Sequence, residues 1–234
     1  MAKTIGLSRA IKLEWLNKTV DLVLEGLSPE EIKDELNAYI AYEISSPDNI
    51  RKSRDILMNL WVRPFDYEAA NAIREKALGE IRNGNTDRMA MHWCMLLLYY
   101  PVFVDVTGTI GKIAVMQDSF TLAWLKEKIF EQWGERTTLI HSIPKIMQTI
   151  RQIGAVESSG TAYQVVRQEI KDDQTKIILV KTILALKMKP YYEPAEMTTI
   201  PQLFPFTFEL SSDVIFGSGA FEFGNFSGNH VLIS

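Results

Sequence analysis

Cysteine is nearly absent from this sequence, in which Cys94 is the single example. One thiol excludes an internal disulfide and a zinc site built on several cysteines, which favours a reducing, cytoplasmic location. The three histidines, His92, His141 and His230, are scattered without the spacing of metal ligands. No carboxylate pair stands out from the charged helix faces. We therefore expect no metal, no cofactor and no catalytic centre, so that the chain would not be an enzyme.

A membrane-length apolar run is also missing. The longest apolar stretch covers residues 89–104 and contains His92 and Pro101, whereas a span needs about 20 uninterrupted residues. The first residues lack the apolar segment of a secretion signal. We interpret residues 89–104 as a buried helix that stops before Pro101, and we expect no membrane contact.

Basic side chains are missing from the C-terminal end. Residues 193–234 contain five acidic side chains and no Lys or Arg, whereas residues 119–192 contain eleven basic and seven acidic ones. The whole chain has a net charge of −4 and 47% apolar residues, which is ordinary for a globular protein. This segregation indicates a basic middle segment that could face an anionic partner.

The first hundred residues have helical periodicity and recognisable helix boundaries. Ser8 is expected to open the first helix and Gly26 to end it. Residues 28–31 read Ser-Pro-Glu-Glu, a capping box with proline at the first helical position, and Ser46-Pro47 repeats the arrangement. Residues 66–82 form another expected helix. These segments predict an N-terminal helical domain over residues 1–115.

The segment after Pro101 continues as a weaker helix toward Met116. Gly108 and Gly111 are expected to interrupt it, so we place the linker between two subdomains at residues 105–118. Residues 108–112 partly match a phosphate-binding loop, but the motif is two residues short and lacks the hydroxyl that binds magnesium. Glycines that allow close packing are the better explanation.

Residues 116–192 have the order of a winged helix-turn-helix domain. A helix over 120–133 precedes a second helix, which Ser142 is expected to cap and which runs through Ile153. Gly154 has the position of a left-handed C-cap. Two short strands then follow, joined by Ser158-Ser159-Gly160.

The second of these helices separates polar from apolar side chains cleanly. Its exposed face would carry the side-chain types that read base edges or phosphates from a recognition helix. Basic residues also follow the hairpin, and others lie on the helix that begins after Ser46. The predicted DNA-binding residues are Lys145, Gln148, Thr149, Arg151, Gln152, Arg167, Lys171, Arg51, Lys52 and Arg54. The alternative is that these residues are simply solvated helix faces.

Residues 173–188 leave helix and strand open. Asp172 or Asp173 could cap a buried helix there, whereas the β-branched residues at 177–180 also suit a strand.

The last unit, residues 193–234, predicts a small antiparallel β-meander. Seven of the eleven Phe lie between Phe204 and Phe226. A lone hairpin is marginally stable, so its aromatic face must pack on another surface; that face comprises Phe206, Phe208, Phe221 and Phe223. Because the tail lacks Lys and Arg, we expect that residues 196–234 can be removed without loss of DNA binding, provided that the remainder folds.

Four stretches carry a resemblance to a known family. They are the end of the leucine-rich opening helix at residues 24–28 (LEGLS), residues 45–54 (SSPDNIRKSR) with Leu57 and Leu60, the apolar helix before Phe103, and the helix at 146–154 followed by Ala155-Val156-Glu157. Together they resemble the BrxA family of BREX phage-defence systems, over about residues 7–170. The resemblance implies a helical N-terminal domain, a winged-helix-like second domain, DNA binding, and work beside a methyltransferase and an ATPase. The aromatic, acidic tail departs from the family pattern.

The sequence thus predicts a mainly α protein with an N-terminal helical bundle, a winged-helix-like domain and a C-terminal β-meander. The expected function is a non-enzymatic component of a prokaryotic phage-defence complex that binds double-stranded DNA and the other proteins of that complex. A protein–protein scaffold and an RNA-binding helical protein are the alternatives. Steep salt dependence would indicate nucleic acid, because each neutralised phosphate releases counterions.

Overall fold

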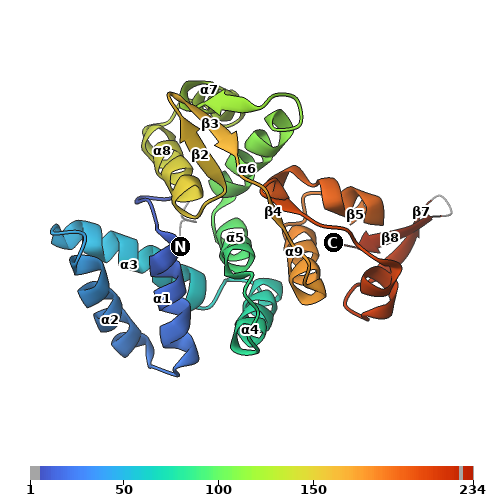
Figure 1. The fold of residues 1–234 in the computed structure, drawn as a ribbon, viewed down its shortest axis with the longest axis horizontal. Helices are drawn as coiled ribbons and strands as arrows, with labels where there is room; N and C mark the ends of the chain where they lie inside the picture. Colours follow the sequence, from blue (N-terminus) through green and yellow to red (C-terminus); the bar gives the residue numbers. More distant parts are fainter. Residues whose placement is uncertain (1–5, 227–228, 234) are drawn as a thin grey trace.

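The computed structural model describes residues 6–226 and 229–233, and it is mainly helical (Figure 1). Six helices occupy the N-terminal half: α1 Leu13–Leu24, α2 Pro29–Ala41, α3 Pro47–Trp61, α4 Glu68–Arg82, α5 Arg88–Tyr99 and α6 Pro101–Ile113. Helices α1, α2 and α3 form one side of the molecule, and α5 lies near its centre. The helical bundle predicted for the N-terminal half is therefore confirmed.

Local capping chemistry sets several of these boundaries. The Ser28 hydroxyl accepts from the Glu31 N–H, and the Glu31 carboxylate accepts from the Ser28 N–H at 2.8 Å, so the predicted capping box is present. Gly26 follows α1 with φ of +80°, a left-handed conformation that favours glycine. The expected start of α1 at Ser8 is wrong, because the helix begins at Leu13.

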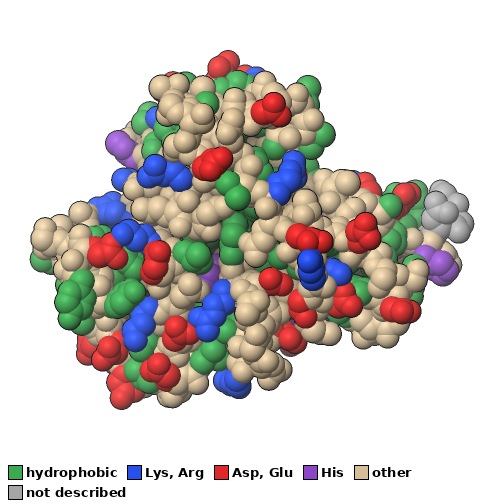
Figure 2. All heavy atoms as spheres, viewed as in Figure 1, with side chains coloured by type: hydrophobic (Ala, Val, Ile, Leu, Met, Phe, Trp, Pro, Cys, Tyr) green, Lys and Arg blue, Asp and Glu red, His purple; other side chains and the backbone are tan. Residues whose placement is uncertain are grey.

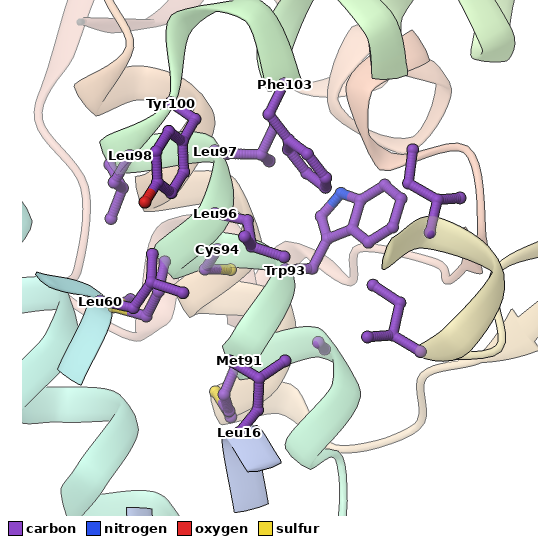
Figure 3. Close-up of a cluster of buried hydrophobic side chains, with 14 of the residues drawn as sticks. Leu16, Leu60, Met91, Trp93, Cys94, Leu96, Leu97, Leu98, Tyr100 and Phe103 are labelled. Atoms are coloured by element: carbon purple, nitrogen blue, oxygen red, sulfur yellow. The ribbon is translucent and has the colours of Figure 1, made fainter. Parts of the chain in front are cut away.

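Helix α5 is buried on nearly all sides (Figure 3). Trp93 lies at its middle, with its ring centroid 5.1 Å from that of Phe103 on α6. The helix ends before Pro101, as predicted, and its apolar surface is covered by protein. Within the described residues, none of the helices combines the length and the apolar character needed to cross a bilayer.

Helix α6 runs without a break through Gly108 and Gly111, so the expected interruption is wrong. A Cβ atom at Gly111 would collide with the backbone of Pro201, and one at Gly108 would press on the Gln202 side chain. The glycines therefore allow a second segment to approach α6 closely, at the price of some helix propensity.

A compact unit of strands and helices follows: β1 Ser119–Thr121, α7 Leu122–Trp133, α8 Thr137–Gln152, β2 Val156–Ser159 and β3 Ala162–Val165. The strands form an antiparallel sheet in the order β1-β3-β2, with Phe120 opposite Tyr163. The hairpin and the left-handed Gly154, with φ of +89°, match the sequence prediction. Strand β1 was not predicted, and Ser142 is a buried residue inside α8, not its cap.

Residues 173–185 are helical, which resolves the choice between helix and strand. Helix α9, Asp173–Ala185, is capped by Asp172, whose carboxylate accepts from the Thr175 N–H at 2.8 Å. The helix packs against α4 and α5. The division of the chain at residues 115 and 192 stays a prediction.

The C-terminal segment forms two small sheets and three helical turns. Strand β4, Gln168–Glu169, pairs in parallel with β6, Phe206–Thr207, while β5 Tyr191–Tyr192, β8 Asn229–Ile233 and β7 Phe223–Phe226 form an antiparallel sheet in that order. The turns are η1 Pro194–Thr199, η2 Pro201–Leu203 and η3 Asp213–Gly217. The predicted small antiparallel sheet near the C-terminus is confirmed.

The tail is part of the central core. The rings of Phe204 and Phe206 lie 5.3 and 5.8 Å from that of Trp93, whose Nε1 donates to the Gln202 carbonyl at 2.8 Å. The predicted packing of Phe206 on the rest of the protein is confirmed, but Phe223 is 37% exposed. Removal of residues 196–234 would uncover Trp93 and α6, so the condition set for this deletion, that the remainder folds, is not expected to hold.

Candidate nucleic-acid interface

Helix α8 presents a polar face of intermediate exposure. His141 and Arg151 are exposed, whereas Lys145, Gln148 and Gln152 are half-buried. The opposite face carries the apolar residues that join the core. The amphipathic separation seen in the sequence is therefore present, but only part of the polar face is freely open to solvent.

Thr149 is buried, so its side chain is not available for the DNA contact that the sequence predicted. Its hydroxyl accepts from the Ile11 N–H at 3.0 Å and donates to the Lys145 carbonyl at 2.9 Å. The extended segment of residues 6–12, here named the N-terminal arm, covers this edge of α8. Gly6 lies against Ser142 at the same edge, where a Cβ atom would have no room. A helical wheel places Thr149 at the margin of the polar face, and the arm occupies that margin.

The N-terminal arm adds Arg9, which the sequence analysis did not identify. Its Nε donates to the Asn49 side chain at 2.8 Å, and its Nη2 lies 3.6 Å from the Asp48 carboxylate. The arm thus bridges α8 to the start of α3. The available signal was a basic residue in a segment without helical periodicity, which is too common to predict a site.

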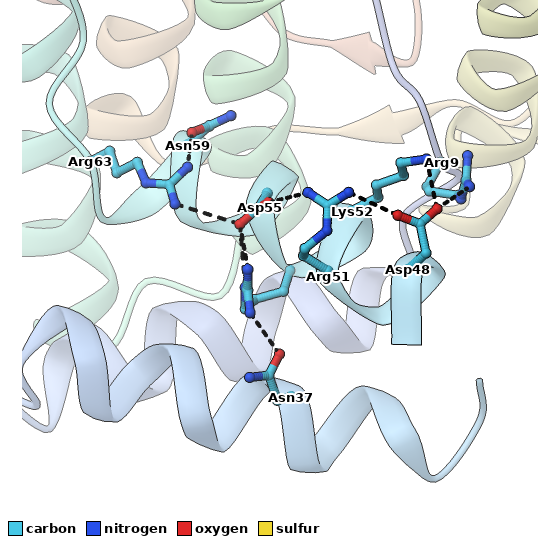
Figure 4. A network of polar contacts seen from close by, with 9 residues as sticks. Arg9, Asn37, Asp48, Arg51, Lys52, Asp55, Asn59 and Arg63 are labelled. Carbon is cyan, nitrogen blue, oxygen red and sulfur yellow. Dashed lines mark hydrogen bonds and ion pairs between the residues drawn. The ribbon is translucent and has the colours of Figure 1, made fainter. Parts of the chain in front are cut away.

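The basic residues predicted on α3 belong to a network around two carboxylates (Figure 4). Arg51 pairs with Asp48 at 2.8 Å and with Asp55 at 3.5 Å, while Lys52 pairs with Asp48 at 2.6 Å. Hydrogen bonds from Lys52 and then Arg51 lower the pKa of Asp48, so this carboxylate stays ionised. The five cations of the network, which exceed its two carboxylates, are Arg9, Arg51, Lys52, Arg54 and Arg63.

Arg54 is a structural member of that network. Its side chain is only 11% exposed and donates to Asn37 of α2 at 3.0 Å and to Asp55 at 2.8 Å. Its guanidinium joins α2 to α3 and is not directed toward solvent. Its low exposure makes Arg54 a poorer candidate for a DNA contact than Arg51, which is 54% exposed.

Arg167 and Lys171 lie apart from the α8 face. The Arg167 guanidinium donates to the Phe204 carbonyl at 3.3 Å, and Lys171 pairs with Glu169 at 3.3 Å. Both residues are exposed on the segment between β3 and α9. On the other side of the hairpin, Arg151 approaches the Ser158 hydroxyl at 3.5 Å. The structure thus brings Arg151, but not Lys171, next to the hairpin strand that follows α8.

The basic side chains of the two neighbouring regions gather at one junction. Figure 2 shows Lys and Arg side chains where the α8 unit meets the N-terminal helices, with acidic side chains among them. The contacts of Ile11 with Thr149 and of Arg9 with Asn49 join these regions directly. Lys145 of α8, whose carbonyl accepts from Thr149, and Arg51 and Lys52 of α3 therefore lie near the N-terminal arm, whereas Arg151 lies toward the hairpin.

Two buried titratable side chains, His92 and Cys94, are enclosed by the protein core. His92 is fully buried, its Nε2 lies 2.9 Å from the Asn17 side-chain oxygen, and burial lowers its pKa to about 3. Burial raises the pKa of the Cys94 thiol to about 12, which keeps it protonated and unreactive. In the part of the chain that the structure describes, no three His, Cys, Asp or Glu side chains gather closely enough to hold a metal ion.

Compared with known protein families, with curated proteins and with solved structures, the chain matches none of them.

Proposed function

We propose that this protein binds double-stranded DNA as a non-enzymatic component of a larger assembly. The observation that carries the proposal is the order α6-β1-α7-α8-β2-β3, with the polar face of α8 beside a hairpin. This is the order of elements in a winged helix-turn-helix domain, whose second helix of the turn motif enters the major groove. Helix α8 occupies that position in the chain.

The side chains around α8 support a division of roles. Lys145 and Gln148 lie on the half-exposed polar face and are suited to base edges or nearby phosphates. The exposed cations Arg151 and Arg51 are suited to phosphates on either side. Arg9 on the N-terminal arm extends this basic surface toward α3. We name Lys145, Gln148, Arg151, Arg9 and Arg51 the α8 surface.

Local charge, not net charge, would drive this binding. The chain as a whole is acidic, but the cations around Asp48 and Asp55 exceed the carboxylates they contact. If the protein neutralises about four phosphates, its affinity for DNA should fall about a hundredfold when the salt concentration rises from about 50 to about 200 mM. A flat salt response would contradict the proposal.

The biological setting follows from the resemblance to the BrxA family of BREX phage-defence systems. That resemblance supports a cytoplasmic role in a prokaryotic defence complex, in contact with its other proteins. It adds no residue to the α8 surface.

The test is fluorescence anisotropy with a labelled DNA duplex. The double variant Lys145→Glu with Arg151→Glu is expected to weaken binding by about tenfold or more, because two phosphate or base contacts become repulsive. The control reverses two charges elsewhere, Lys18→Glu with Arg82→Glu, and is expected to bind as the parent protein does. Equal losses in both variants would indicate a general charge effect and refute the α8 surface.

A second candidate function, protein–protein scaffolding, is favoured by an exposed aromatic group on the tail. Phe216 is 53% and Phe226 52% exposed, and Phe216 stacks on Phe223 with 5.1 Å between ring centroids. Exposed aromatic clusters commonly mark protein contacts. A scaffold would bind its partner with little salt dependence and would ignore the duplex. A duplex RNA of the same length distinguishes RNA binding from DNA binding, because a DNA-binding protein should bind this RNA more weakly than the DNA duplex.

A further inference from the structure

A cavity of about 330 Å³ lies between α4, α9 and the C-terminal tail. Helix α4 contributes Ile73, helix α9 contributes Ile178 and Leu184, and the tail contributes Phe221 and Ile233. Within the tail, the Ile233 N–H donates to the Glu222 carbonyl at 3.1 Å, which joins the two tail segments that line the cavity. This volume falls at the lower end of the range for small-molecule sites, about 300–1,000 Å³.

The rim of this cavity carries three lysines, Lys76 from α4 and Lys181 and Lys187 at α9. Among the described residues, no carboxylate forms an ion pair with any of the three, although other lysines of the chain are paired. Glu222 is the acidic side chain of the lining. The lining itself therefore holds three ammonium groups and one carboxylate, with Glu80 and Asp172 near Lys76 outside the lining.

Lys76 and Lys181 are close enough for one charge to act on the other. Burial lowers the pKa of Lys76, and the charge of Lys181 lowers it further, while Glu80 and Asp172 act in the opposite direction. An anion between Lys76 and Lys181 would relieve their mutual repulsion. The rim is therefore electrostatically suited to a negatively charged group.

The lining also restricts the rest of the ligand. It is largely aliphatic, with Phe221 as its one aromatic side chain, so it offers little surface for stacking a nucleobase. A hydrocarbon chain gains from burial against such side chains by about 25 cal/mol per Å². We propose that this cavity binds an anionic amphiphile, a single medium-length acyl or alkyl chain with a carboxylate or phosphate head group held by Lys76 and Lys181.

The site is independent of the α8 surface. It is built by α4, α9 and the tail, none of which contributes a residue to the α8 surface. Because the tail forms one wall, a bound ligand would also hold the tail in place.

The experiment is isothermal titration calorimetry of the full chain with decanoate, decyl phosphate and, as the neutral comparison, decanol, all of the same chain length. The two anions are expected to bind with one-to-one stoichiometry, and the tighter of them identifies the head group. The double variant Lys76→Gln with Lys181→Gln is expected to bind them about tenfold more weakly or worse, because two charge-assisted hydrogen bonds are lost. The charge-matched control, Lys18→Gln with Lys112→Gln, should bind as the parent does.

A second variant tests the location. Ala72 lies at the exposed edge of the cavity, so Ala72→Phe should fill the entrance without disturbing the core. Ala38→Phe on α2, also at an exposed helix position, controls for the added ring. Loss of binding in Ala72→Phe alone supports the site. The proposal is overturned if neither anion binds, if decanol binds as tightly as decanoate, or if Ala72→Phe leaves binding unchanged.

Discussion

The hydroxyl of Thr149 on α8 accepts a hydrogen bond from the backbone N–H of Ile11, a residue 138 positions earlier in the chain. Both groups are buried, so water cannot replace either partner. The bond fixes the N-terminal arm along α8 and thereby brings Arg9 near this helix. It also explains why a threonine at the margin of a polar helix face is unavailable to a ligand.

Thr149→Val keeps the side-chain shape but removes this acceptor. The Ile11 N–H would be left buried without a partner, so we expect the free energy of unfolding to fall by about 1–3 kcal/mol. Thr138→Val, at an exposed position of the same helix, should change it by less than about 0.5 kcal/mol. Urea denaturation of both variants measures the difference, and equal stabilities would show that the arm is not held by Thr149.

Gly111 and Gly79 should respond in opposite directions to alanine. Gly111→Ala places a methyl group against the backbone of Pro201, and overpacking of this kind lowers stability by about 1–3 kcal/mol. Gly79 lies in α4 with open space where its Cβ would be, so Gly79→Ala should raise stability by about 0.5–1 kcal/mol. Thermal unfolding measures both. Stabilisation of the chain by Gly111→Ala would refute the close contact between η2 and α6.

Arg54 is a structural cation and Arg51 a surface cation, so their replacement should affect stability differently. Arg54→Met removes a nearly buried guanidinium, leaves Asn37 without this donor and leaves Asp55 with only the 3.5 Å contacts of Arg51 and Arg63. We therefore expect a loss of about 2 kcal/mol in stability. Arg51 is more than half exposed, and Arg51→Met should change stability by less than about 0.5 kcal/mol.

The same pair should behave oppositely in DNA binding. Arg51→Met is expected to reduce the salt dependence of duplex affinity, because one phosphate contact is lost. Arg54→Met should leave the affinity of the folded protein unchanged at a temperature well below its unfolding transition. A selective loss of affinity in Arg54→Met would return that residue to the interface.

The buried His92 should make the fold sensitive to acid. Burial lowers the pKa of His92 to about 3 in the folded state, whereas the unfolded chain has a pKa of about 6.5. Between these values the unfolded state binds a proton that the folded state does not, so stability falls as the pH drops below about 6.5. The slope from this group is about 1.4 kcal/mol per pH unit, and the contribution vanishes above that pH.

The check is denaturant unfolding of the parent and of His92→Gln at several pH values between 5 and 8. The variant should lose stability at neutral pH, through altered packing against Asn17, but show a shallower decline in acid. His141→Gln, at an exposed position, should retain the parent slope. Parallel curves for parent and His92→Gln would mean that His92 is not the acid-sensitive group.

Features that depend on neighbouring residues could be predicted from the sequence. The capping box at Ser28 and Glu31, the left-handed Gly154 and the hairpin between β2 and β3 each need only a few adjacent residues. The burial of α5 was also predictable, because a helix that is apolar on all sides must be covered by other elements. The polar face of α8 follows from helical periodicity in the same way.

Features that depend on a partner distant in the chain were decided by the tertiary structure. For Gly108 and Gly111 the sequence suggested both an interrupted helix and close packing, and the structure shows packing alone because Pro201 and Gln202 lie against an unbroken α6. Phe206 and Phe223 have the same alternation, yet only Phe206 meets Trp93 and is buried. The sequence records which side chains can be buried or can bind an anion. Whether each one is covered depends on which distant segment packs on it, because burial and hydrogen bonding require atoms within a few ångströms, and only the folded chain brings those atoms together.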